Sequence, residues 1–75
     1  GHFTFILSVP SQVHIVIFSV GGRRVDELHT DGWLGYNQVA WEPRSGLANG
    51  SYLYRISAWS EAGEATAEGV IQIAR

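Results

Sequence analysis

The chain has 75 residues, which is enough for one small domain and no more. Five basic and seven acidic residues give a formal net charge of −2, so the electrostatic footprint of a nucleic-acid-binding protein is missing. The absence of cysteine excludes disulfides and thiolate zinc sites, and no apolar run approaches the roughly 20 residues of a membrane span.

The opening dipeptide Gly1-His2 resembles the remnant of a purification tag, and no signal peptide is visible. We expect residues 3–75 to form a single domain, the carboxyl-terminal module of a longer exported protein.

The first twenty residues predict two strands. Residues 2–9 (HFTFILSV) alternate between two faces with period 2, which is typical of a strand. A turn at 10–12 leads into 13–20 (VHIVIFSV), where β-branched residues disfavour a helix. We expect these two strands to pair as a hairpin. The Gly21-Gly22 pair then predicts a tight turn, because positive φ costs glycine little.

The segment 23–29 (RRVDELH) is ambiguous. Val25 and Leu28 stand three positions apart, which suits a helical turn. The segment is short and bounded by glycines, however, so we favour a short strand or a bulged edge strand. Residues 30–35 (TDGWLG) predict a loop.

The second half predicts three more strands. Residues 36–41 resume the alternation, and Pro43 places the following segment in a loop. In that loop Gly46, Asn49 and Gly50 tolerate left-handed backbone just before the strand over 51–59. A last strand over 66–74 completes about six to seven short strands, which predict an all-β, antiparallel β-sandwich of the immunoglobulin or fibronectin type III kind.

No catalytic residue or cofactor site can be assigned. No serine stands in a Gly-x-Ser-x-Gly turn, and the Gly21-Gly22 pair is not followed by a helix that could bind phosphate. His14 lies mid-strand between apolar neighbours, and we interpret it as an outward-facing residue of a half-solvated sheet.

The run DELHTD holds four side chains that could bind a hard cation: Asp26, Glu27, His29 and Asp31. It lacks the spaced Asp/Asn-Gly pattern of a calcium loop. We interpret it as a charged edge that discourages strand-to-strand aggregation, and we assign no metal site.

The aromatic residues divide into two groups. Trp41, Tyr52 and Tyr54 fall on predicted buried faces and are expected to build the core. Trp33, Tyr36 and Trp59 lie in a loop or near strand ends, where exposed rings could stack on the apolar C–H face of a sugar. A small carbohydrate-binding module is therefore an alternative function.

Two longer segments resemble bacterial immunoglobulin-like modules. The stretch VHIVIFSVGGRRVDEL is similar to their V-x-L-x-V-Y-D-x-x-G-R-x-V-x-x-L pattern. The stretch YNQVAWEPRSGLANGSYLYRISA is similar to the next segment, a Val-Val-Trp strand followed by Gly-Leu-x-x-Gly-x-Tyr-x-Tyr-Arg. The families concerned are the Ig-like domain of the flagellar hook-capping protein and the type A C-terminal sorting domain of the type IX secretion system. The matching positions are Gly22, Val25, Leu28, Trp41, Gly46, Leu47, Gly50, Tyr52 and Tyr54.

The chain departs from these families in several places. Their usual opening Pro-Asn-Pro strand has no counterpart, Ser19 stands where they have aspartate, and Glu42-Pro43 follows the tryptophan in place of Asp-Gly. The lysine that the sorting family has near its last strand is also missing, and only Arg75 is basic there.

The resemblance implies a non-catalytic accessory domain of a secreted or cell-surface bacterial protein, serving secretion, sorting, anchoring or structural support. Its expected partners are the neighbouring domain of the parent chain and secretion machinery or a surface component. A sheet edge left open by the missing first strand would also allow an edge-strand dimer.

Overall fold

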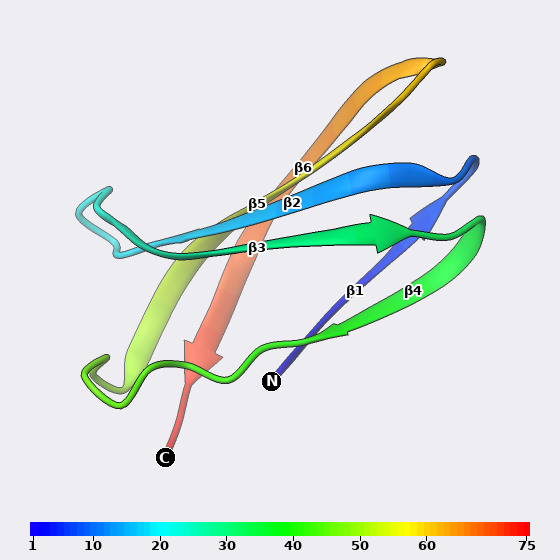
Figure 1. Cartoon of the computed structure of the whole chain (residues 1–75). Coiled ribbons are helices and arrows are strands. Elements are labelled where there is room, and N and C mark those ends of the chain that lie inside the picture. The colour runs from blue at the N-terminus through cyan, green and yellow to red at the C-terminus, as the bar shows by residue number, and fades with distance from the viewer.

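The computed structural model describes all of residues 1–75 and contains six strands and no helix. The strands form two antiparallel sheets that face each other, one with the order β1-β4 and one with the order β3-β2-β5-β6 (Figure 1). The prediction of a small all-β sandwich is confirmed, with six strands. These strands are β1 (His2–Leu7), β2 (Ser11–Phe18), β3 (Arg24–Gly32), β4 (Gly35–Ala40), β5 (Gly50–Ser60) and β6 (Gly63–Ile73).

The predicted hairpin between the first two strands is wrong. β1 pairs with β4 along its whole length, and β2 pairs with β3 on one side and β5 on the other. β1 lies in the two-stranded sheet and β2 in the four-stranded sheet, and each presents one apolar face to the core between them. The short link between them therefore carries the chain across the sandwich. A period-2 pattern shows which face is buried but does not identify the neighbouring strand.

The core lies between the two sheets and is built on aromatic and β-branched side chains. Trp41, just after β4, is 2% exposed, and Ile15 and Ile17 of β2 are fully buried. The Phe3 ring of β1 contacts the Tyr54 ring edge-on at 5.1 Å and the Trp41 ring at 5.8 Å. The contact with Tyr54 of β5 packs the two-stranded sheet against the four-stranded one, whereas the contact with Trp41 lies within the two-stranded layer. The remaining members of the buried cluster are Val13, Tyr52, Ile56, Ala58 and Ile73.

The ambiguous segment after Gly22 is the edge strand β3, and it contains a bulge. Phe18 pairs with Arg24, but the preceding Ile17 pairs with Asp26, so Val25 is an extra residue in the ladder. The strand continues to Gly32, which corrects the predicted loop over 30–35: only the two residues at 33–34 separate β3 from β4.

The loop between β4 and β5 is held by side chains rather than by left-handed backbone. Of the three residues expected to tolerate left-handed backbone, only Gly50 has a positive φ, of 141°, and Gly46 and Asn49 do not. The amide oxygen of Asn49 accepts a hydrogen bond from the backbone N–H of Arg75, and the Arg75 guanidinium donates to backbone carbonyls of the loop, among them that of Pro43 at 3.0 Å. The loop is therefore closed by the segment that follows β6.

The structure contains no helix of the length and apolar character that crossing a membrane requires. β1 and β4 form the smaller layer, and each of them is hydrogen-bonded to a neighbour on one side only. The larger layer presents an outer face on which β2 and β3 lie side by side (Figure 1).

Candidate functional site

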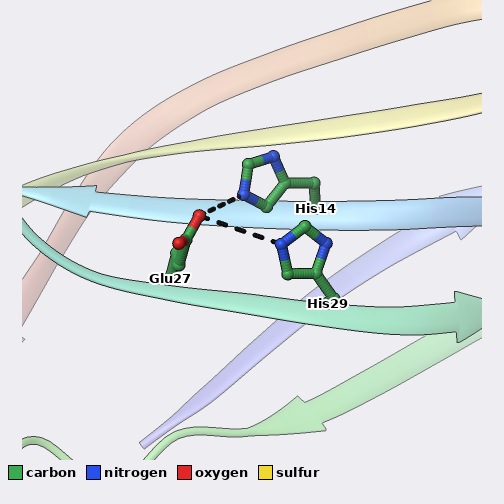
Figure 2. Close-up of side chains that lie close together, drawn as sticks. All are labelled: His14, Glu27 and His29. Atoms are coloured by element: carbon green, nitrogen blue, oxygen red, sulfur yellow. Dashed lines mark hydrogen bonds and ion pairs between the residues drawn. The ribbon is translucent and has the colours of Figure 1, made fainter.

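Three side chains that can bind metal ions lie together on the outer face of β2 and β3. His14 of β2 stands directly opposite His29 of β3 in the strand register. Glu27 precedes His29 by two residues, so both project from the same face of β3. Figure 2 shows the three side chains converging above the two strands. The backbone pairing of β2 with β3 is unbroken over this stretch, so it fixes the backbone positions from which the three side chains project.

The Glu27 carboxylate is the centre of this cluster. Its Oε2 lies 2.8 Å from Nε2 of His14 and 3.8 Å from Nε2 of His29 (Figure 2). The two imidazole rings stack almost parallel, with centroids 4.1 Å apart and planes inclined by 9°. The side chains of His14, Glu27 and His29 are 24%, 44% and 67% exposed, so solvent and small solutes can reach them.

The electrostatics of the cluster favour the ionised carboxylate. The hydrogen bond from His14 is the main cause that lowers the pKa of Glu27 below its ordinary value of 4.5. Partial desolvation acts in the opposite direction, and the positive charge of Arg24, 3.6 Å away, adds to the lowering. Glu27 is therefore a carboxylate at neutral pH and can accept hydrogen bonds or bind a cation.

The four candidate metal ligands of the DELHTD run do not form a common site. Asp26 turns to the opposite side, where its Oδ2 accepts a 2.9 Å hydrogen bond from Nε1 of Trp41. Asp31 remains on the outer face, but its Oδ1 accepts a hydrogen bond from Gln12 at 3.1 Å. Glu27 and His29 are thus joined by a third residue from another strand.

The third residue is His14, which the sequence predicts to face outward from a half-solvated sheet. It does face outward, and the β2–β3 register places it beside Glu27 and His29. The sequence signal that could have revealed this is a histidine on each side of a predicted hairpin turn. Using it requires the register, and hence the bulge at Val25.

The three aromatic residues predicted as a possible sugar site, Trp33, Tyr36 and Trp59, are brought together only in part. Trp33 and Trp59 line one open groove of about 460 Å³, and their exposed fractions are 69% and 41%. Tyr36 is also 66% exposed, but it lies on β4 in the other sheet and does not line this groove. The polar side chains of the groove are Ser11, Gln12, Asp31, Ser60 and Glu61.

The positions that carry the family resemblance lie in turns and in or against the core. Gly22 makes the β2–β3 turn with a φ of 92°. Val25, Leu28, Leu47 and Tyr54 are partly buried against the core. The hydroxyl of Tyr52 reaches back to the preceding loop and donates a 2.7 Å hydrogen bond to the carbonyl oxygen of Ala48. These residues shape the fold, and none of them belongs to the histidine cluster or to the aromatic groove.

No family model, no curated protein and no solved structure matches this chain.

Proposed function

We propose that this chain is a non-catalytic, immunoglobulin-like accessory domain of a secreted bacterial protein, serving secretion and sorting, surface anchoring or structural support. The observation that carries the proposal is the hydrogen bond from the Tyr52 hydroxyl to Ala48. In immunoglobulin-like sandwiches a tyrosine near the start of the penultimate strand bonds to backbone a few residues upstream in the same way. Tyr52 lies near the start of β5, the penultimate strand here.

The order of the strands supports the same proposal. In immunoglobulin-like domains the penultimate strand lies between the last strand and an early strand of the same sheet. β5 lies between β6 and β2, and the chain changes sheets at the corner before it. The shared sequence pattern therefore falls on residues that define this corner and the core behind it. Because the shared residues build the fold and do not form a reactive site, they suit an accessory domain that other proteins recognise as a folded unit.

Export of a reporter tests the sorting role directly. The chain is fused to the carboxyl end of a fluorescent reporter that carries a general export signal, in a bacterium with type IX secretion. We expect the reporter to reach the cell surface or the medium, while the same reporter without the chain stays in the periplasm. Periplasmic retention of the folded fusion protein would reject secretion and sorting and leave support of a neighbouring domain as the proposed role.

Carbohydrate binding is a second candidate function, favoured by the groove between Trp33 and Trp59. Sugar rings present apolar C–H faces to aromatic rings and hydroxyls to polar groups. The groove offers both, because Gln12 and Asp31 form a hydrogen-bonded pair beside the two indoles. Exposed aromatic side chains that share a groove with polar groups are typical of binding sites.

Tryptophan fluorescence during titration with soluble glycans tests this second function. Saturable quenching by one glycan class is expected, together with its loss in Trp33→Ala and Trp59→Ala. Tyr36→Ala is the matched control, because the Tyr36 ring is about as exposed as that of Trp33 but lies outside the groove. Binding that survives both tryptophan substitutions would show that the groove is not the sugar site.

A further inference from the structure

We propose that His14, Glu27 and His29 form a binding site for a divalent first-row transition-metal ion, with Zn²⁺ as its representative, on the outer face of β2 and β3. Each residue offers one ligand atom, and these atoms all lie within 4.8 Å of one another. The site is separate from the proposed accessory role, because none of its residues belongs to the fold signature.

The separations between the ligand atoms fit a small ion. Zinc–nitrogen and zinc–oxygen bonds of 2.0–2.2 Å in tetrahedral geometry place neighbouring ligand atoms about 3.3 Å apart. Oε2 of Glu27 lies 2.8 Å from one imidazole nitrogen and 3.8 Å from the other, which brackets that value. Small rotations of side chains that are partly exposed are therefore enough to admit the ion.

The backbone supplies the rigidity that the exposed side chains lack. His14 and His29 are paired across neighbouring strands, and the register is anchored by Ile15 opposite Leu28 on the core side. Two changes accompany binding. The parallel imidazoles turn so that both lone pairs point at one ion, and Glu27 exchanges its hydrogen bond with His14 and its ion pair with Arg24 for a bond to the metal.

The chemistry of the ligands decides the class of ion. Two imidazole nitrogens and one carboxylate oxygen suit zinc and its first-row neighbours, whereas calcium and magnesium prefer sites made of oxygen atoms. Three protein ligands leave a fourth position for water or for a group from another molecule. The ion would thus connect the edge strand β3 to its neighbour β2 and present an open coordination position to solvent.

Isothermal titration of the whole chain with zinc chloride at about pH 7.5 tests the proposal. We expect one saturable zinc site and a Tm that rises with zinc concentration. His14→Ala and His29→Ala should each weaken zinc binding by about tenfold or more, and Glu27→Gln should weaken it too. Magnesium chloride should give no comparable signal.

Two controls separate this site from other ligands in the chain. His2→Ala removes the remaining histidine, which stands beside the amino terminus, and Glu68→Gln removes a comparable exposed carboxylate on β6. Both should bind zinc as the unchanged chain does. Circular dichroism shows whether each variant is folded. Absence of saturable zinc binding, or unchanged affinity in the folded His14→Ala and His29→Ala variants, would overturn the proposal.

Discussion

The indole Nε1 of Trp41 donates a 2.9 Å hydrogen bond to Oδ2 of Asp26, and this bond joins the segment after β4 to the edge strand β3 of the other sheet. Trp41 is the largest side chain buried in the core, so its only polar atom needs a partner inside the protein. Asp26 also accepts a hydrogen bond from the backbone N–H of Glu27 and lies 3.5 Å from Arg44. A single carboxylate therefore links the two layers at the rim of the core.

Replacement of Asp26 by alanine is expected to lower the free energy of unfolding by about 1–3 kcal/mol, because it leaves the buried indole N–H of Trp41 without an acceptor. Asp26→Asn keeps an acceptor and should cost less. Urea denaturation measures both changes. Asp31→Ala is the control, since it removes only an exposed hydrogen bond to Gln12 and should change stability by less than about 0.5 kcal/mol. Equal losses in the two alanine variants would contradict a special role for Asp26.

The same carboxylate predicts sensitivity to acid. Burial alone would raise the pKa of Asp26, but hydrogen bonds from Trp41 and from the backbone of Glu27, together with Arg44, lower the pKa below its ordinary value of 3.8. A lowered pKa in the folded state stabilises the protein fully above the ordinary value, and this contribution is lost as the pH falls through the lowered one. The stability difference between the unchanged chain and Asp26→Asn should therefore shrink below about pH 4. Urea denaturation at neutral and acid pH measures it, and a difference that grows in acid would contradict the assignment.

The strands were predictable because each buries one face, but their pairing was not. The spacing of Val25 and Leu28 shows why. Three positions apart, they could not both face the core in a regular strand, yet both pack against it because the bulge at Val25 shifts the register by one residue. The odd spacing that suggested a helical turn is thus the sign of the bulge.

The histidine cluster depends on the extra residue, Val25, that the bulge inserts into β3. Phe18 pairs with Arg24, so an unbroken ladder would place His14 opposite Leu28 and turn His29 toward the core side. With the bulge, Leu28 packs on the core and His14 meets His29. Sequence patterns gave the burial of these residues, whereas the cross-strand contacts that make the site require a register that only the folded chain defines.

The turn before β5 gives a matched test of backbone conformation. Gly50 has a φ of 141°, which side chains rarely adopt, and open space surrounds the position that a Cβ would occupy. Gly50→Val should therefore cost about 1–3 kcal/mol through backbone strain alone. Gly46 has equally open surroundings but no positive φ, so Gly46→Val should be nearly neutral. Thermal unfolding of the two variants compares them, and equal Tm values would mean that the turn is not strained.

The corner between the sheets gives the last prediction. Tyr52 is 8% exposed, and its hydroxyl bonds the carbonyl of Ala48 four residues upstream. Tyr52→Phe keeps the ring and removes that bond, so the free energy of unfolding should fall by about 0.5–1.5 kcal/mol. Tyr36→Phe makes the same chemical change on a ring that is 66% exposed, and it should leave stability unchanged. If urea denaturation shows no difference between the two variants, the Tyr52 hydroxyl does not stabilise the corner, and the likeness to immunoglobulin domains loses its strongest support.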